Sequence, residues 1–202
     1  MVWFGQIPQM EKYLFQSNCM KAYNNLERKD KLHRLLMQVP DIVDSFSKRD
    51  ISASAKWIEW LKISESTLKE YNYSECSQLS GLRSSIISSQ LSTDADSSRR
   101  KHVDKVCLST IEPSQQIITK IHDSLNSKIE IAYSLFRQVL VPMRENKLVS
   151  MDNISDTTEY ISTLLRQLCL NEQLSANING IIATIGKTDT VKIIEEILTE
   201  KL

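Results

Sequence analysis

The sequence predicts an all-α protein, a bundle of seven to eight helices around one long central helix that covers about residues 111–141. Two observations favour this class. Residues 111–141 contain no glycine and a single proline near their start, and their apolar residues recur at helical spacing. In addition, the 202-residue chain has only four glycines and four prolines, which are too few for the tight turns of a multi-stranded fold.

The predicted central helix has two different halves. Residues 113–128 carry one apolar stripe, so this half needs cover on one side only. Residues 129–141 are apolar nearly all the way round, and a helix of that kind has to be enclosed by other elements. We therefore expect residues 129–141 to be buried on every side, by this chain's own helices or by a second copy.

Three helical segments precede the central helix. Apolar residues at helical spacing place them at 9–39, 52–71 and about 75–91. The first segment is one kinked helix or two, and it ends at Pro40, so residues 40–50 form a polar connection.

The approach to the central helix is polar at first and then helical again. Residues 92–98 are rich in serine and aspartate and predict a loop, and residues 99–111 resume the helical spacing. Pro113 then either lies in the first turn of a new helix that Thr110 caps or kinks one very long helix.

The C-terminal part predicts a helical hairpin over residues 154–201. Gly186 suits the position after a helix end, where a left-handed backbone is needed, and Thr188 or Asp189 caps the last helix. We expect residues 1–150 to form the helical bundle and residues 151–202 a subdomain packed on it, in one continuous domain.

The charge balance bears on the class of partner. Lys and Arg together number 25, as do Asp and Glu, so the net charge is zero, whereas nucleic-acid-binding proteins are usually basic. From residue 151 onward there are four basic and eight acidic residues, a net charge of −4 that leaves +4 for residues 1–150. This asymmetry could orient a partner.

Cysteine usage and hydropathy indicate the compartment. The four cysteines are far apart, with no Cys-x-x-Cys, as is typical of buried free thiols in a reducing compartment. The N-terminal residues lack the basic leader and apolar core of a signal peptide, and no apolar stretch approaches the ~20 residues of a membrane span. We expect a cytoplasmic protein, with the nucleus as the alternative, and no membrane span.

One residue pair has a spacing with catalytic potential. Arg28 and His33 have the Arg-x4-His spacing of helical RNases of the HEPN superfamily, in which Arg would stabilise a phosphorane and His would move a proton. No cofactor or metal site is predicted, because a di-iron bundle needs two Glu-x-x-His units and Asp30-Lys-Leu-His33 is the one near match.

Two further groups of residues are candidates for contact with a partner. Aromatic residues are over-represented at interface hot spots, and the candidates of this type are Trp3, Phe4, Trp57 and Trp60. Cations that could contact phosphates cluster at the predicted start of a helix, and they are Arg99, Arg100, Lys101 and Lys105. We expect Trp60, or the N-terminal arm that holds Trp3 and Phe4, to contribute to an exposed apolar patch.

The function expected first is that of a non-enzymatic interaction protein, an adaptor or accessory subunit of a larger cytosolic complex. Its partner would be a protein, either another chain or a second copy. The alternatives are a helical RNase that uses Arg28 and His33, and a nucleic-acid-associated subunit that uses the basic cluster at 99–105.

Overall fold

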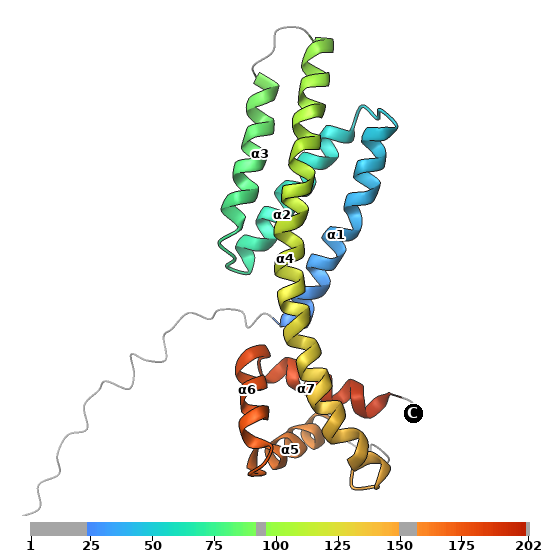
Figure 1. Cartoon of the computed structure of the whole chain (residues 1–202), viewed down its shortest axis with the longest axis vertical. Coiled ribbons are helices and arrows are strands. Elements are labelled where there is room, and N and C mark those ends of the chain that lie inside the picture. The colour runs from blue at the N-terminus through green and yellow to red at the C-terminus, as the bar shows by residue number, and fades with distance from the viewer. Residues whose placement is uncertain (1–23, 92–95, 150–156, 201–202) are drawn as a thin grey trace, which may run out of the picture.

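The computed structural model describes residues 24–91, 96–149 and 157–200, and this part of the chain is all-α, as predicted. It contains seven helices and no strand (Figure 1). The helices are α1 (Asn25–Ser47), α2 (Ala53–Glu70), α3 (Cys76–Leu91), α4 (Asp96–Glu145), α5 (Thr157–Leu170), α6 (Ser175–Ile185) and α7 (Lys187–Thr199).

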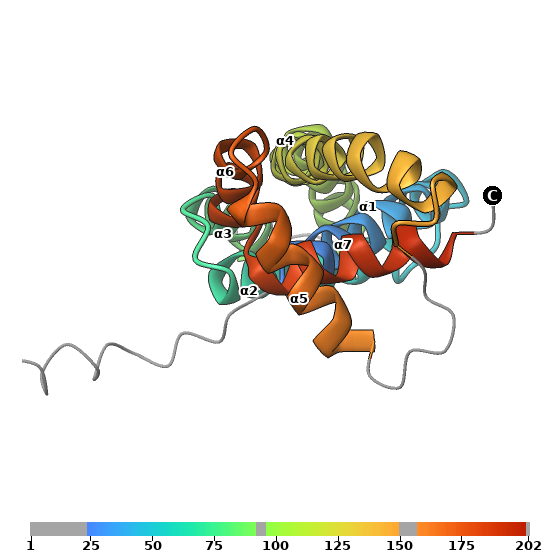
Figure 2. The same cartoon turned by 90° about the horizontal axis from the view of Figure 1, so that it is seen from below.

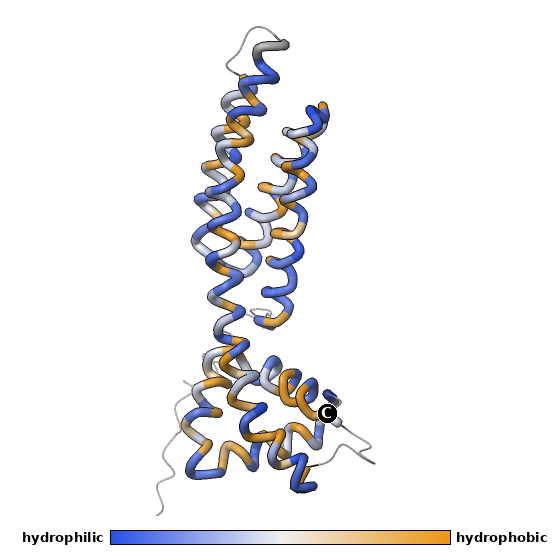
Figure 3. The backbone as a smooth tube through the Cα atoms, turned by 45° about the vertical axis from the view of Figure 1, so that its right-hand side comes forward, coloured by the Kyte–Doolittle hydropathy of each residue, from blue (hydrophilic) through white to orange (hydrophobic). Residues whose placement is uncertain are grey.

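Helix α4 is the long axis of the molecule. Helices α1, α2 and α3 pack around its first half, and α5, α6 and α7 gather around its second half (Figures 1 and 2). Hydrophilic and hydrophobic stretches alternate along the helices of both lobes (Figure 3), as expected of helices that are covered on one side. None of the described helices combines the length and the apolar character that crossing a membrane requires.

The buried apolar residues form two clusters, one in each lobe. The first joins α1, α2, α3 and the first half of α4, as far as Leu125. The second begins at Ile129 and joins the rest of α4 to α5, α6 and α7. The boundary between the two clusters therefore lies within α4, between residues 125 and 129. The division into residues 1–150 and 151–202 stays a prediction.

Helix α4 is longer than the sequence predicts, because it continues through both of its prolines, Pro113 and Pro142. Thr110 does not cap a new helix. Its buried hydroxyl donates to the Cys107 carbonyl at 2.7 Å and accepts a hydrogen bond from the Trp57 indole at 2.8 Å. The very long helix, the second of the two alternatives, is therefore the one observed.

The prediction that Pro40 ends the first helix is wrong. Helix α1 continues to Ser47, and residues 40–47 are its last two turns. Ile42 is buried in the first cluster and Phe46 packs against it. Packing of this apolar face outweighs the one backbone hydrogen bond that a proline removes from a helix.

This chain's own helices do not enclose residues 129–141 on every side, so enclosure by a second copy is the alternative that stays a prediction. One stripe of this half is buried, at Ile129, Ala132, Phe136 and Leu140. Ile131, on another side, is 61% exposed, because α5, α6 and α7 cover α4 from one direction (Figure 2). Residues 113–128 are covered on one side only, as expected, because Gln116, Lys120, Asp123 and Lys128 are exposed, while Gln115 is half-buried.

Three helices end in the same way, with a non-glycine residue in the left-handed conformation. These residues are Arg49 after α1, Asn72 after α2 and Lys147 after α4, with φ of 56°, 59° and 55°. In each case the next N–H donates to a carbonyl five residues earlier, at 2.9 Å. This is the hydrogen bond of a Schellman motif, which satisfies helix carbonyls that have no partner within the helix.

Gly186 links α6 to α7, but the predicted caps do not form. Its φ of 89° is positive, as expected, while its ψ of 155° lies outside the left-handed helical region. Helix α7 starts directly at Lys187, and no side chain caps it. Asp189 is instead buried, and its carboxylate accepts a hydrogen bond from the Asn25 N–H at 2.5 Å, where α1 begins.

Candidate functional site

The predicted RNase pair is not brought together. Arg28 lies over the ring of Tyr71, with its guanidinium carbon 5.3 Å from the ring centroid. His33 lies against His122 of α4, with the two ring centroids 5.7 Å apart. Five residues on an α-helix correspond to about 140° around the axis, so the two side chains leave α1 in different directions. The geometry gives this pair no shared site.

The two tryptophans of α2 are core residues, so the expectation that Trp60 forms part of an exposed patch is wrong. Trp57 and Trp60 are 0% and 2% exposed, and their rings stack with centroids 4.6 Å apart. Both indole N–H groups are satisfied, because Trp60 donates to the Leu35 carbonyl at 2.9 Å and Trp57 to Thr110. A buried tryptophan usually finds such a partner. Trp3 and Phe4 lie outside the described residues.

The basic cluster lies on one wall of a groove that the sequence does not reveal. Arg100 and Lys101 line a groove of about 760 Å³ between the C-terminal end of α1 and the N-terminal part of α4. The apolar part of its lining comes from Phe46 and Leu108, and the latter is 48% exposed. Arg49 adds a cation from the α1 side, and its carbonyl accepts a hydrogen bond from Arg100 at 3.1 Å.

The two carboxylates in this groove are already engaged. Asp50 accepts from Lys56 at 2.7 Å and from both the N–H and the hydroxyl of Ser52, and these contacts hold its pKa well below the usual range. Asp104 accepts from the Ser54 hydroxyl and lies 3.9 Å from Arg100.

Two cations of the groove are unpaired. Among the described residues, Arg49 and Lys101 have no carboxylate within ion-pair distance. The predicted cluster also includes Arg99, half-buried beside the groove, and Lys105, which is exposed outside it. Sequence reasoning missed Phe46 and Arg49 because residues 40–50 read as a polar connection.

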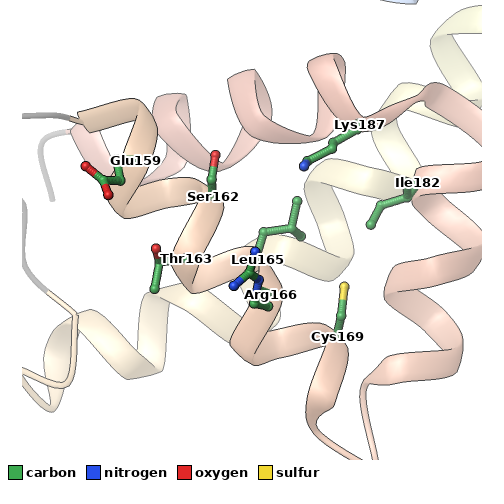
Figure 4. Close-up of a pocket in the computed structure, with 8 residues that line it drawn as sticks. All are labelled: Glu159, Ser162, Thr163, Leu165, Arg166, Cys169, Ile182 and Lys187. Atoms are coloured by element: carbon green, nitrogen blue, oxygen red, sulfur yellow. The ribbon is translucent and has the colours of Figure 1, made fainter.

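A second pocket, of about 480 Å³, opens between α5, α6 and α7 (Figure 4). The residues that line it are Glu159, Ser162, Thr163, Leu165, Arg166, Cys169, Ile182 and Lys187. It combines two cations and two hydroxyls with an apolar wall. The sequence gives no signal for it, because Arg166 and Lys187 are far apart in the chain and only the packing of α5 against α7 brings them to one pocket.

The described residues hold no group of three or more His, Cys, Asp or Glu side chains placed to bind a metal ion. The described cysteines, Cys76, Cys107 and Cys169, are free thiols. Burial raises the pKa of Cys107 to about 11, which keeps this thiol protonated and unreactive near neutral pH. Cys76 and Cys169 are only half-buried.

Comparison of this chain with protein families, with curated proteins and with solved structures gives no match. Its function is therefore inferred from its own residues and their arrangement.

Proposed function

We propose that this chain is a non-enzymatic interaction protein, an adaptor or accessory subunit of a larger cytosolic complex, which binds an acidic amphipathic helix of a protein partner. The observation that carries the proposal is the groove between α1 and α4, with Phe46 and Leu108 as its apolar surface and Arg49, Arg100 and Lys101 as its cations. Amphipathic helices are commonly bound by laying their apolar face into such a groove.

The charges of the groove favour an acidic partner. Asp50 and Asp104 are each held by a hydroxyl and a cation of this chain, whereas Arg49 and Lys101 are free of carboxylates in the described structure. An acidic residue of the partner would therefore meet unpaired positive charge. Complementary charge of this kind mainly sets specificity and the rate of association, while apolar contact supplies most of the affinity.

Arg49 projects from the turn that borders the groove, with its backbone in the left-handed region. The same backbone follows two other helices, at Asn72 and Lys147, so the conformation belongs to this type of helix end. The position of Arg49 at the groove, and not its backbone, is what supports the proposal.

The cytosolic setting is supported by the cysteines. Cys76, Cys107 and Cys169 are all free thiols, and proteins of oxidising compartments usually pair their cysteines. Support for the RNase alternative is weak, since Arg28 and His33 contact different helices.

A nucleic-acid partner is the second candidate, and one observation favours it. Arg49 joins the cluster of Arg99, Arg100, Lys101 and Lys105 at the same end of the molecule (Figure 1). Phosphate contacts from such a cluster would depend on all of its cations and would weaken with salt. The groove proposal depends instead on the cations that line the groove and on Leu108.

The test is binding of a fluorescent, helical peptide of about 18 residues, with leucines on one face and glutamates on the other, to the full-length chain. Fluorescence anisotropy measures the affinity. We expect Leu108→Ser and Lys101→Gln each to weaken binding about tenfold, as is usual for residues at the centre of an interface. Lys105→Gln is the matched control, because Lys105 is an exposed cation of the same helix outside the groove.

The result that would overturn the proposal is peptide binding that is absent, or that Lys105→Gln weakens as much as Lys101→Gln. Retention on a heparin column distinguishes a nucleic-acid partner from the acidic helix proposed above. If the chain is retained at low salt, and if Lys105→Gln reduces retention while Leu108→Ser leaves it unchanged, the cluster acts as a phosphate-binding surface.

A further inference from the structure

The pocket between α5, α6 and α7 has the size and composition of a small-molecule site. Its volume of about 480 Å³ falls within the range of roughly 300–1,000 Å³ that is typical of ligand pockets. Leu165, Cys169 and Ile182 form an apolar wall, and polar groups from α5 and α7 complete the lining. Mostly apolar walls with a few convergent polar groups are characteristic of such sites.

The two cations of this pocket have no acidic partner among the described residues, although the region is acidic. Residues 157–200 contain six acidic and three basic residues, and two of the three basic ones, Arg166 and Lys187, line this pocket. Neither forms an ion pair or a side-chain hydrogen bond with another described residue. Both cations of the pocket are therefore without a carboxylate partner in the part of the chain that the structure describes.

The one carboxylate of the lining is placed away from Lys187. Figure 4 shows the Lys187 ammonium directed toward α5, and Glu159 at the opposite end of the pocket with its carboxylate directed outward. Ser162 lies between these ends, and it can donate a hydrogen bond to an anion. The Lys187 ammonium and the Glu159 carboxylate are thus separated along the pocket, and the second cation, Arg166, lies on α5.

We propose that this pocket binds a small organic anion, a carboxylate or phosphate monoester whose apolar body lies against Leu165 and Ile182. The oxyanion meets Arg166, which offers paired donors, and Lys187, which offers a point charge. An apolar body is required because a bare inorganic ion leaves the apolar wall in contact with water. This site lies in the other lobe from the α1–α4 groove and does not depend on the function proposed for that groove.

Cys169 provides a site-specific readout, because its thiol lines the pocket. The experiment measures the rate of Cys169 alkylation by iodoacetamide in the full-length chain, by peptide mass spectrometry, with and without phenyl phosphate or benzoate. A ligand at about ten times its Kd should slow alkylation about tenfold, because protection follows 1 + [L]/Kd. Cys76, which is half-buried in the other lobe, is the internal control and should react at an unchanged rate.

Matched variants test whether the charges of Arg166 and Lys187 bind the anion. Arg166→Gln and Lys187→Gln should each weaken protection of Cys169 about tenfold, since each removes a charge-assisted contact. Lys192→Gln changes an exposed cation of the same helix outside the pocket and should leave protection unchanged. All three residues are exposed, so the variants are expected to fold.

Three results would overturn the proposal. The first is that neither anion protects Cys169 from alkylation. The second is that neutral phenol protects Cys169 as well as the anions do. The third is that Lys192→Gln weakens protection as much as Lys187→Gln. If inorganic phosphate protects Cys169 as strongly as phenyl phosphate does, the site binds free oxyanions, and the proposed requirement for an apolar body is refuted.

Discussion

At the residue scale, Arg49 joins a strained backbone to a charge that lines the groove. Its φ of 56° is close to the 55° of Lys147, which follows α4 in the same type of helix end. The two residues differ in their surroundings, because Lys147 does not line the groove. They therefore form a natural pair in which the energetic effect of the backbone can be separated from the effect of the charge.

We expect Arg49→Gly and Lys147→Gly each to raise the free energy of unfolding by about 0.5–1 kcal/mol, because glycine adopts positive φ without strain. Only Arg49→Gly should also weaken binding of the acidic peptide. Urea denaturation followed by circular dichroism gives the stability, and fluorescence anisotropy gives the affinity. Equal loss of affinity in both variants would show that the charge of Arg49 has no specific role in the groove.

At the element scale, the helices are set by their apolar stripes and their ends by local hydrogen bonds. Helix α1 continues through Pro40, and α4 through Pro113 and Pro142, because packing on both sides of each proline holds the helix together. The break between α6 and α7 is different, since it depends on the single residue Gly186.

Replacing Gly186 tests whether the break between α6 and α7 depends on this residue, and replacing Gly180 is the comparison. Gly186 combines φ of 89° with ψ of 155°, a conformation essentially restricted to glycine, so Gly186→Ala should lower the free energy of unfolding by about 1–3 kcal/mol. Gly180 lies inside α6, and a Cβ atom there would meet no neighbouring atom within 4 Å. Gly180→Ala should therefore stabilise the protein by about 0.5–1 kcal/mol. Thermal or urea unfolding measures both, and a Gly186→Ala protein as stable as the wild type would contradict the first expectation.

At the scale of the whole molecule, two lobes share one helix and meet again at the start of α1. There the Asp189 carboxylate of α7 accepts from the Asn25 N–H, and the Asn25 amide donates to the Ile185 carbonyl at 2.8 Å. Burial raises the pKa of Asp189 above its usual value, against the opposing effect of the hydrogen bond from the Asn25 N–H. A buried carboxylate thus connects the lobes outside α4.

Replacing Asp189 should weaken this link. Asp189→Ala leaves the half-buried Asn25 N–H without its acceptor, and we expect a loss of about 1–3 kcal/mol in the free energy of unfolding. Asp189→Asn keeps an oxygen acceptor and should lose less than half as much. Chemical denaturation of both variants near neutral pH makes the comparison, and equal losses would refute the role of the acceptor.

The same residue predicts a pH dependence. Because the pKa of Asp189 is higher in the folded state than the ordinary aspartate value, the folded state holds this proton more tightly than the unfolded state. Stability contributed by Asp189 is therefore present at low pH and falls as the pH rises through the folded-state pKa. Relative to Asp189→Asn, the wild type should lose stability as the pH rises above the ordinary aspartate pKa and through the higher folded-state pKa. A constant difference across this range would contradict the prediction.

Much of the fold was predictable from the pattern of apolar residues. The helices at 53–70 and 76–91 lie close to their predicted ranges, and the long central helix is present. The prediction at Pro40 is wrong because tertiary packing outweighs the local effect of a proline. The pattern left the length of α4 open between two alternatives, and it did not show which side of residues 129–141 this chain covers. Of the candidate site residues, Arg100 and Lys101 line a groove, while Trp57 and Trp60 lie in the core.

The sequence by itself determines that this protein is helical, because the 3.6-residue period of apolar side chains and the scarcity of glycine and proline act locally. Only the tertiary structure decides which side of the long helix is covered and that the two tryptophans are buried. It also decides that Arg49 and Arg100 line one groove, and that Arg166 and Lys187 line one pocket. Residues far apart in the chain come together through the angles at which helices pack. Those angles depend on the whole set of side chains in contact, which no local pattern contains.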